Sequence, residues 1–310
     1  MILLTGGAGF IGAALARRLL EDGHDVRILD IMRHGEGHDV PEGVELIKGD
    51  VCDLVEVYDA TEDVDYIVHL ASIAGVGTVG ANPIRTMEVG FEGTHNVLRA
   101  AASYDVKGVL CFSSSEVCGA FTTRVPETEP TPVPPATNVR WGYAAVKLAA
   151  EHLAFAYYTR LGVPVSTFRI FNTYGPGQLG EGAVRNFIRA CAAGEPIVVR
   201  GDGSSIRSWC YVDDIVSAVV CAIKNASNIA GEIINVGNPT TVRTTLELAH
   251  SVRHLWGAAT PDIVFKPATS DVYIRIPDIT KATDLLDGWC PKVDLTQGLL
   301  KTMKRYHDGK

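Results

Sequence analysis

The sequence lacks both an excess of positive charge and paired cysteines. Its 310 residues carry 28 Lys and Arg against 36 Asp and Glu, a formal net charge of -8, and no run of like charges forms a basic stripe. A nucleic-acid-binding protein needs such a stripe, so the sequence argues against that class. The seven cysteines are odd in number and form no CxxC pair. We therefore expect reduced thiols in a cytoplasmic protein rather than a disulfide framework.

Long hydrophobic runs are missing as well. No stretch of about 18 apolar residues is free of charged or strongly polar groups, so the sequence predicts no membrane span. The apolar start MILLTGGAGFIGAALARR has no leading cationic region and is interrupted by glycines, which favours a structural role over a signal peptide. His34 and His38 stand in a polar stretch without a third ligand, so we expect solvated histidines and no metal site.

The chain does contain a regular alternation of short apolar segments and helical patterns. Strands are expected at Ile2–Leu4, Asp25–Asp30, Val44–Ile47, Tyr66–Leu70, Val109–Phe112, Val165–Ile170 and Ile233–Val236, and helices at Glu92–Ala102, Tyr143–Arg160, Val184–Ala193 and Asp213–Lys224. This alternation predicts an α/β fold with a doubly wound parallel sheet of the Rossmann type. A smaller interleaved α/β domain is expected after Ile170, which gives a larger domain at 1–170 and 207–236 and a smaller one at 171–206 and 237–310.

A glycine-rich turn follows the first predicted strand. Gly6, Gly9 and Gly12 have the spacing GxxGxxG between a strand and a helix, where a pyrophosphate can approach bare backbone at the positive end of the helix dipole. Asp30 ends the second strand, and its carboxylate would accept the ribose hydroxyls of NAD and repel a 2′-phosphate. Arg33 nearby keeps NADP as the alternative.

The third predicted strand is followed by two further candidate cofactor contacts. Asp50 and Val51 stand after this strand, where they can meet the adenine. A surface aspartate with no such role is the alternative explanation of Asp50.

A candidate proton-transfer group lies in the middle of the chain. Tyr143 and Lys147 are four residues apart at the start of a predicted helix, so they share one helix face. An ammonium that close would lower the pKa of the phenol from about 10 and make it a base near neutral pH. Ser113, Ser114 and Ser115 end the preceding strand, where a hydroxyl could hold the substrate while NAD takes a hydride. A chance YxxxK spacing in an ordinary helix is the alternative.

Seven segments of the chain resemble one enzyme family. They are TGGAGFIG (5–12), HLAS (69–72), SSSEVCG (113–119), YAAVK (143–147), RIFNTYGPGQ (169–178), RSWCYVDD (207–214) and RIPDITKA (275–282). Together they resemble the extended short-chain dehydrogenases/reductases that act as nucleotide-sugar epimerases, dehydratases and decarboxylases. The resemblance implies a triad of Ser114, Tyr143 and Lys147, with Lys147 also holding the nicotinamide ribose.

The same resemblance implies contacts with cofactor and substrate. It assigns Phe10, Ile11, Leu70 and Ala71 to NAD, Asn172 to the substrate diphosphate, and Arg207 to the nucleotide sugar. It also implies a homodimer through the helices near 84–102 and 142–160, and a UDP-sugar as the small-molecule partner. The larger predicted domain would then bind NAD and the smaller one the nucleotide sugar.

Ser115 and Glu116 bear on which member of the family the chain resembles. The 4-epimerases usually carry small or hydroxyl residues after the triad serine, and the hexose 4,6-dehydratases carry Asp-Glu. Ser-Glu together with Arg207 resembles the UDP-glucuronate decarboxylases, so Glu116 joins the predicted catalytic set and Ser115 the substrate contacts. A 4-epimerase, which needs only the Ser-Tyr-Lys set, is the main alternative. A 4,6-dehydratase and a non-catalytic NAD-binding protein are weaker ones.

Three positions depart from the family's usual residues near the sugar. Gly90 stands where an asparagine beside the cofactor is common, Cys118 replaces a tyrosine and Gly177 replaces an arginine. These departures predict a sugar specificity that differs from that of typical members.

Overall fold

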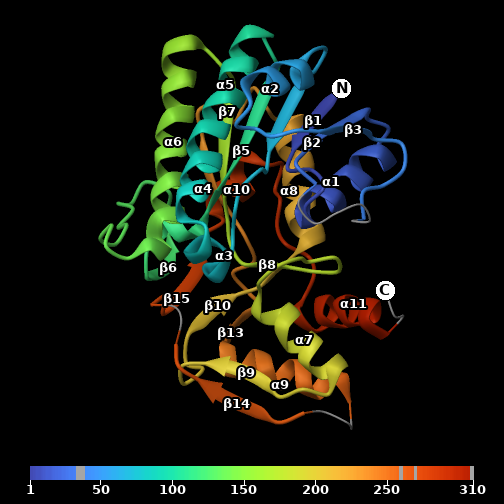
Figure 1. Ribbon diagram of the computed structural model, residues 1–310, viewed down its shortest axis with the longest axis vertical. Helices are drawn as coiled ribbons and strands as arrows, with labels where there is room; N and C mark the ends of the chain where they lie inside the picture. Colours follow the sequence, from blue (N-terminus) through green and yellow to red (C-terminus); the bar gives the residue numbers. More distant parts are fainter. Residues whose placement is uncertain (33–38, 258–260, 269–270, 308–310) are drawn as a thin grey trace.

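The computed structural model describes residues 1–32, 39–257, 261–268 and 271–307, and its central feature is a sheet of seven strands (Figure 1). We call this sheet the main sheet. All its strand pairs are parallel, in the order β12-β7-β5-β4-β1-β2-β3. The strands are β1 (Ile2–Thr5), β2 (Val26–Asp30), β3 (Glu45–Lys48), β4 (Tyr66–His69), β5 (Gly108–Ser114), β7 (Val165–Ile170) and β12 (Ile233–Val236). Each predicted strand has its counterpart in the sheet, and the predicted fold class is confirmed.

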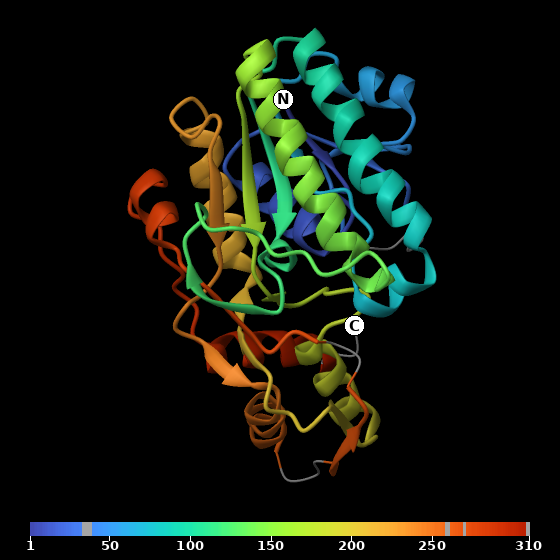
Figure 2. The same cartoon turned by 90° about the vertical axis from the view of Figure 1, so that its left-hand side faces the viewer.

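Helices pack on both faces of the main sheet. One face carries α1 (Phe10–Glu21) and α8 (Val212–Lys224), and the other carries α2 (Leu54–Thr61), α5 (Thr94–Ser103) and α6 (Gly142–Leu161). In Figure 2 the helices α5 and α6 lie side by side in front of the strands. The strands contribute to two apolar cores, one on each face, as a parallel sheet covered by helices requires.

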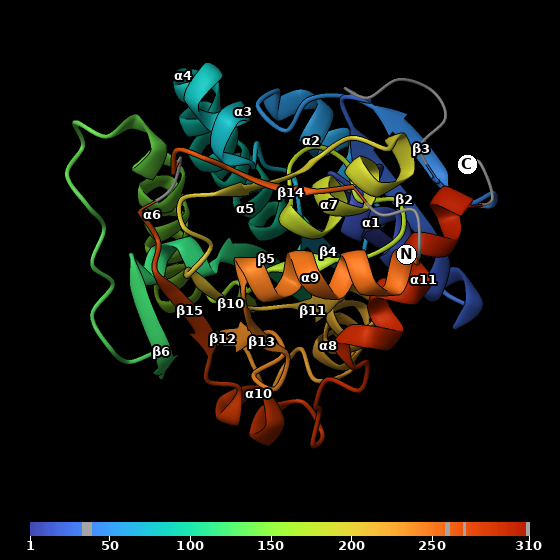
Figure 3. The same ribbon diagram turned by 90° about the horizontal axis from the view of Figure 1, so that it is seen from below.

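A second lobe lies beyond the carboxyl ends of the main-sheet strands (Figures 1 and 3). The lobe contains a four-stranded sheet with the order β13-β10-β15-β6, here called the small sheet. Two separate strand pairs, β11-β8 and β14-β9, complete the lobe. These strands are β6 (Phe121–Val125), β8 (Thr173–Tyr174), β9 (Ile197–Arg200), β10 (Ile206–Ser208), β11 (Cys210–Tyr211), β13 (Val242–Thr244), β14 (Ile263–Lys266) and β15 (Ile274–Pro277). The helices α7 (Ala183–Ala193), α9 (Thr245–Trp256) and α11 (Leu295–His307) pack against one another, and α10 (Thr280–Leu285) contacts β12.

The helix expected at Glu92–Ala102 has a different start. The chain forms α3 (Val76–Ala81), α4 (Pro83–Glu88) and a π-helical turn at Val89–Gly93 before α5 begins. Gly90 lies in this turn, and a Cβ atom there would stand 2.8 Å from both methyl carbons of Val146 on α6. A glycine at this position therefore lets α6 pack closely against the π-helical turn.

The described part of the chain bears on a membrane-spanning helix and on a metal site. No helix within it is long and apolar enough to cross a membrane. It also contains no group of three or more His, Cys, Asp or Glu side chains arranged to hold a metal ion. Arg33, His34 and His38 lie outside the described residues.

Candidate active site

The glycine turn between β1 and α1 is closed tightly by its neighbours. Gly6 has a φ of +70°, and a Cβ atom there would lie 2.7 Å from the backbone of Ala71, which follows β4 together with Leu70. Gly9 caps α1 without a side chain, and a Cβ on Gly12 would lie 2.6 Å from Gly7. The turn therefore presents bare backbone at a helix N-terminus, which fits the pyrophosphate of a dinucleotide.

The first residues of α1 close one side of this turn. Phe10 and Ile11 follow the cap and are partly buried against the apolar core. The Phe10 ring reaches toward the chain after β8, because a Cβ atom added at Gly175 would lie 3.4 Å from its Cζ. The start of α1 therefore packs against the loop that leads to α7.

Two aspartates stand at the same edge of the main sheet. The Asp30 carboxylate ends β2 and accepts hydrogen bonds from the backbone N–H of Ala8 at 3.1 Å and of Met32 at 2.8 Å. It therefore lies beside the glycine turn, where a ribose diol would need an acceptor. Asp50 accepts from the Cys52 N–H at 2.9 Å and forms an ion pair with Arg85.

Val51 is held in place by the neighbouring helix. Its side chain is buried, and its carbonyl accepts a hydrogen bond from the Asn96 side chain at 3.0 Å. A Cβ atom on Gly93 would stand 2.7 Å from a Val51 methyl group. The loop after β3 is thus packed against α5 and the π-helical turn.

Ser114 and Tyr143 are brought together at the end of β5. Ser114 is the last residue of that strand, and Tyr143 is in the first turn of α6. Burial raises the pKa of Tyr143 to about 12, while hydrogen bonding to Ser114 and Ser72 acts in the opposite direction. The charge of Glu116 adds to the increase. The predicted lowering of the phenol pKa toward neutrality is therefore absent, because burial outweighs the favourable contacts.

Lys147 is buried one helical turn beyond Tyr143. Its ammonium donates to the Phe112 carbonyl on β5 at 2.7 Å and lies 5.9 Å from the centre of the Tyr143 ring. Burial lowers the pKa of Lys147 to about 8, and interactions with Cys111 and Glu151 oppose that decrease. The ammonium is therefore tied to the strand backbone in this structure.

His69 lies beneath the same group and is fully buried. Its Nδ1 is 2.7 Å from the Thr5 hydroxyl and its Nε2 is 3.1 Å from the Thr94 hydroxyl, which in turn donates to the Gly90 carbonyl. Burial, with a smaller contribution from the Lys147 charge, lowers the pKa of His69 to about 3. The imidazole is therefore neutral and hydrogen-bonded, and it links β4 to α5.

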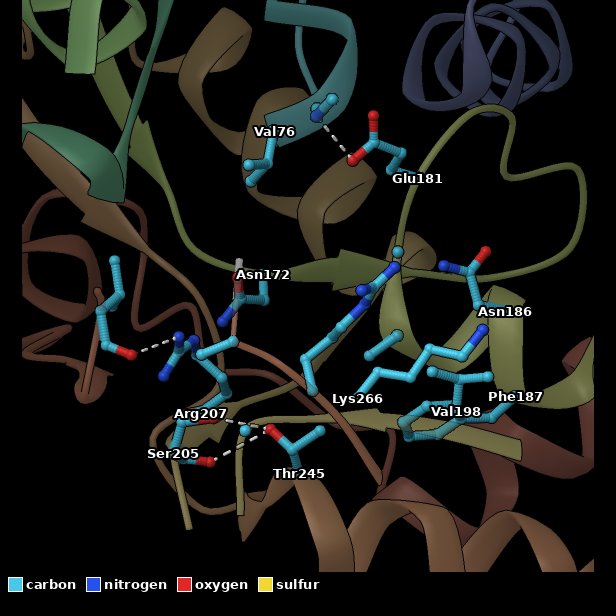
Figure 4. A pocket seen from close by; sticks show the side chains of 18 of the residues that line it. Val76, Asn172, Glu181, Asn186, Phe187, Val198, Ser205, Arg207, Thr245 and Lys266 are labelled. Carbon is cyan, nitrogen blue, oxygen red and sulfur yellow. Dashed lines mark hydrogen bonds between the residues drawn. The ribbon is translucent and has the colours of Figure 1, made fainter. Parts of the chain in front are cut away.

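A large cavity separates the main sheet from the second lobe (Figure 4). It has a volume of about 1090 Å³ and is lined at one end by Glu116 and Asn172 and at the other by Phe187, Val198 and Lys266. The volume slightly exceeds the upper limit of about 1,000 Å³ that is usual for ligand pockets. The cavity lies at the carboxyl edge of the strands, where ligands of this fold bind.

The end of the cavity lined by Glu116, whose charge also acts on Tyr143, holds a cluster of arginines around that carboxylate. Arg275 is almost fully buried and forms an ion pair with Glu116 Oε1, while Arg140 Nη2 lies 3.4 Å from Oε2. Asp271 accepts from Arg140 Nη1 at 3.1 Å. Arg207 donates to backbone carbonyls of β10 and of the segment before β15. Three cations against two carboxylates leave this arginine cluster with a net positive charge.

The charges in the arginine cluster act on one another. Burial lowers the pKa of Arg207 to about 10, and the cations of Arg275 and Arg140 contribute to that decrease while Glu116 opposes it. Because part of this decrease comes from the neighbouring cations, an added anion would relieve their repulsion. The arginine cluster is therefore suited to bind a carboxylate or a phosphate.

Asn172 and Ser115 occupy different positions relative to the cavity. The Asn172 amide lines it and donates weakly to the Ser208 carbonyl at 3.4 Å (Figure 4). Ser115 is buried in the 3₁₀ turn after β5 and stands outside the set of lining residues. The sequence predicts a substrate contact for both, and only Asn172 faces the cavity.

The rim of the cavity is bridged by Glu181. Its carboxylate accepts hydrogen bonds from the backbone N–H groups of Gly77 at 3.0 Å and Thr78 at 2.9 Å (Figure 4). Glu181 belongs to the loop before α7, whereas the two donors belong to α3. The contact therefore joins the two sides of the cavity.

Several site residues are not identified by sequence reasoning. Arg140 and Arg275 line the cavity, Ser72 contacts Tyr143, and Glu151 lies next to Lys147. Arg275 stands in the recognised segment RIPDITKA, and Arg140 stands three residues before Tyr143. These positions in the sequence could have drawn attention to the two arginines, but nothing in the sequence places their side chains beside Glu116.

Comparison with known proteins identifies relatives along the whole chain. The family model described as the NAD dependent epimerase/dehydratase family matches residues 2–237. A UDP-N-acetyl-alpha-D-glucosaminuronate decarboxylase of Bacillus cytotoxicus is 32% identical over 318 residues, which cover 99% of this chain and 97% of the relative. The UDP-glucuronic acid decarboxylase 1 of Danio rerio is 37% identical over 322 residues, which cover 98% of this chain and 72% of the relative.

Solved structures give the same assignment. The UDP-glucose 4-epimerase of Thermotoga maritima with UDP-glucose has a TM-score of 0.90 and 28% identity, covering 99% of both chains. The UDP-glucuronic acid 4-epimerase of Bacillus cereus, in complex with UDP-glucuronic acid and NAD, has a TM-score of 0.88 and 26% identity, covering 100% of this chain and 99% of that one. The predicted family and cofactor are confirmed, and the chain belongs to the NAD dependent epimerase/dehydratase family as an NAD-dependent nucleotide-sugar enzyme.

Proposed function

We propose that this enzyme oxidises C4 of a UDP-hexuronate and then removes the C6 carboxyl group as CO2. The supporting observation is the arginine cluster beside Tyr143, where Arg140, Arg207 and Arg275 outnumber the carboxylates of Glu116 and Asp271. The sugar ring of a UDP-hexose carries no charge of its own beyond the diphosphate, whereas a hexuronate adds a carboxylate two carbons from the oxidised one. The names of the two decarboxylase relatives support the same substrate class.

The first step is removal of the O4 proton and the C4 hydride. Ser114 holds the substrate hydroxyl, Tyr143 takes its proton, and Lys147 holds the cofactor ribose and supports the phenolate. When bound, oxidised NAD supplies a hydride acceptor and a positive charge, and a positive charge near a phenol lowers its pKa. The pKa of about 12 for Tyr143 describes the chain without that charge.

The second step follows from the chemistry of the oxidised sugar. A ketone at C4 makes the C6 carboxylate that of a β-keto acid. The C5–C6 bond breaks, its electron pair moves into the C4 carbonyl as an enolate, and CO2 leaves. A proton taken up from water would then add to C5, the hydride would return to C4, and Tyr143 would return its proton to O4. The product is a UDP-pentose.

The arginine cluster must attract the carboxylate without holding it too tightly, because CO2 can leave only if the negative charge moves away from C6. Glu116 already forms ion pairs with Arg275 and Arg140. We assign Glu116 to the catalytic group because it limits the attraction of these arginines for C6 and lies close enough to affect the pKa of Tyr143.

A 4-epimerase is the second candidate function. Its reaction needs only Ser114, Tyr143, Lys147 and a sugar that can rotate between oxidation and reduction. The similarity to the Bacillus cereus UDP-glucuronic acid 4-epimerase supports it, because that protein also takes a hexuronate. The arginine cluster is compatible with both reactions.

Product mass separates the two candidates. We would incubate the enzyme and NAD separately with UDP-glucuronate, UDP-N-acetylglucosaminuronate and UDP-glucose and analyse the products by mass spectrometry. Loss of CO2 from a hexuronate is the expected result, and a product of unchanged mass that separates from the substrate in liquid chromatography would identify an epimerase. Failure to turn over either UDP-hexuronate would contradict the proposal.

The proposal includes a division of labour along the chain. Residues 1–170 and 207–236 hold NAD, with the pyrophosphate at Gly6, Gly9, Phe10, Ile11 and Gly12, the ribose at Asp30, the adenine at Asp50 and Val51, and the nicotinamide end near Leu70 and Ala71. Residues 171–206 and 237–310 hold the nucleotide sugar. Asn172 binds the diphosphate, and Arg207 binds the sugar end. Ser115 remains a predicted substrate contact.

We also propose a homodimer in the cytoplasm. Exposed apolar side chains gather on neighbouring helices, with Ile84 and Met87 on α4 and Phe155 and Leu161 on α6. A two-fold pairing of these helices would bury them. Sedimentation equilibrium should give twice the chain mass, and a monomer would contradict this part.

All seven cysteines are free thiols, which supports a reducing compartment.

A further inference from the structure

A buried ion pair lies behind Ser114, and the reaction steps above do not use it. Glu151 on α6 and Arg169 on β7 have side-chain exposures of only 3% and 5%. Arg169 donates from Nε to Oε1 at 2.9 Å and from Nη2 to Oε2 at 2.8 Å. The Ser113 hydroxyl donates to Oε1 at 2.5 Å. One carboxylate therefore connects α6, β5 and β7.

Packing alone gives no reason for a charge at this position. The other buried residues on the sheet-facing side of α6 include Ala144, Ala150 and Ala154, so an apolar side chain would suit the interface. Burying two charges costs about as much free energy as their attraction returns, and apolar replacements of such pairs are often as stable. The ion pair therefore contributes little net stability.

The position of Glu151 relative to the proposed catalytic group suggests what the pair does. Tyr143, Lys147 and Glu151 are four residues apart, so they stand one above another on α6. Each meets the end of β5. Tyr143 meets Ser114, Lys147 donates to the Phe112 carbonyl, and Glu151 accepts from Ser113. Successive turns of α6 thus hold three consecutive residues of β5.

We propose that Glu151 is a positioning residue. Held by Arg169, it fixes the end of β5 against α6, so that Ser114 faces Tyr143, and it places a negative charge one helical turn from Lys147. The inference depends on the proposed roles of Ser114, Tyr143 and Lys147.

The electrostatic part of this inference depends on what surrounds Lys147. Glu151 and Tyr143 face it from α6, Cys111 from β5 and His69 from β4. Burial raises the pKa of Cys111 to about 12 and lowers that of His69 to about 3, so both are neutral near pH 7. Among the described groups that act on Lys147, Glu151 is thus the anion that keeps it protonated, and without Glu151 the pKa of Lys147 should fall below about 8.

The test compares three variants. Glu151→Leu/Arg169→Met removes both charges together, so that neither is left buried alone. Ser113→Ala removes the hydrogen bond to β5 and keeps the ion pair. Glu232→Gln, which removes an ion pair with Lys281 outside the site, is the control.

Two measurements report on the two parts of the inference. Single-turnover formation of NADH from UDP-glucuronate should slow about 10- to 100-fold in the double variant, since small displacements at a reacting centre have effects of this size. The Cε resonance of Lys147 in protein labelled with ¹³C-lysine, assigned with Lys147→Arg, should titrate at lower pH than in the wild type. Ser113→Ala should slow NADH formation about 3- to 10-fold and leave the titration unchanged. The control should match the wild type in both.

The possible failures are distinguishable. A folded double variant with wild-type NADH formation and unchanged Lys147 titration would overturn the inference. If the double variant does not fold, Ser113→Ala decides, because wild-type NADH formation in that variant would overturn the positioning role. A wild-type enzyme that turns over no hexuronate would contradict the proposed function instead, and the lysine titration, which needs no turnover, would then decide.

Discussion

The region around Glu116 has two sides that are built in different ways. We call the side with Ser114, Tyr143 and Lys147 the proton-transfer side, and the side with the arginine cluster the arginine side. Ser114, Tyr143 and Lys147 come from β5 and α6, which pack directly together, and their contacts repeat at every turn of one helix. The arginine cluster joins segments far apart in sequence, and Glu116 and Arg275 are separated by 159 positions. The geometry of Ser114, Tyr143 and Lys147 therefore depends on one helix and one strand. The geometry of the arginine cluster depends on how the second lobe folds over them.

The electrostatics of the two sides differ in the same way. At the proton-transfer side burial dominates, raising the pKa of Tyr143 to about 12 and lowering that of Lys147 to about 8. At the arginine side the cations also act on one another, and Glu116 offsets part of their repulsion. Burial is thus the largest influence on both sides, and repulsion between cations is added to it on the second.

The largest expected effect tests the proton-transfer side alone. Tyr143→Phe should reduce C4 oxidation by about 10²- to 10⁴-fold, because the proton acceptor is lost while the packing remains. Equilibrium titration should show unchanged NAD binding. Tyr158→Phe on the same helix is the matched control and should keep full activity. Full activity of Tyr143→Phe would mean that another group removes the proton.

The next effect tests the arginine side. Arg275→Met should lower kcat/KM for the hexuronate about 10- to 100-fold, the value of one or two charge-assisted hydrogen bonds, with little change in NAD binding. Arg243→Met is the matched control. Arg243 is exposed and stands opposite Arg207 in the backbone register of β10 and β13. Equal losses for UDP-glucuronate and UDP-glucose would show that the cluster does not recognise the carboxylate.

A third prediction concerns the pH dependence of stability beneath the proton-transfer side. The pKa of His69 is about 3 when folded and about 6.5 when unfolded, so below about pH 6.5 only the unfolded chain takes up this proton. The contribution of neutral His69 to the free energy of unfolding is complete above about pH 6.5 and is lost progressively as the pH falls toward 3. Urea unfolding should give a free energy lower by about 2 kcal/mol at pH 5 than at pH 7.5 from this residue. His69→Gln should remove that part of the difference, and an unchanged pH dependence would contradict the assignment.

The smallest effect concerns the rim that joins the two lobes. Glu181→Gln weakens the contact with the N–H groups of Gly77 and Thr78 at an exposed position. Exposed contacts of charged groups contribute up to about 1 kcal/mol, so KM for the nucleotide sugar should rise about 2- to 5-fold with kcat unchanged. Initial-rate measurements distinguish this from a catalytic role, which would lower kcat.

The local features of the fold could be predicted well from the sequence. The strand, glycine turn and helix at 2–21 are encoded by residues that are neighbours in the chain, and Gly6, Gly9 and Gly12 lie where their spacing predicts. The start of α5 was predicted less well. The π-helical turn depends on close packing of Gly90 against Val146, a contact between separate helices.

The pKa of Tyr143 shows where prediction from spacing fails. The four-residue separation correctly places Lys147 on the same face of α6. The direction of the pKa shift depends on burial, and burial depends on what the rest of the chain lays over the tyrosine. Spacing alone therefore gives the neighbour of a titratable group without giving its environment.

The sequence by itself determined the doubly wound sheet, the glycine turn between β1 and α1, the shared helix face of Tyr143 and Lys147 and, through resemblance, the family. The first three rest on short-range spacing, which strand and helix geometry convert directly into position. The family rests on the resemblance of seven segments of the chain. The tertiary structure decided the rest: that Arg140 and Arg275 surround Glu116, that Glu181 bridges the rim, and that Glu151 lies buried beside Lys147. The physical reason is that charge interactions depend on distance and burial in space, and residues remote in sequence acquire both only when the chain is folded.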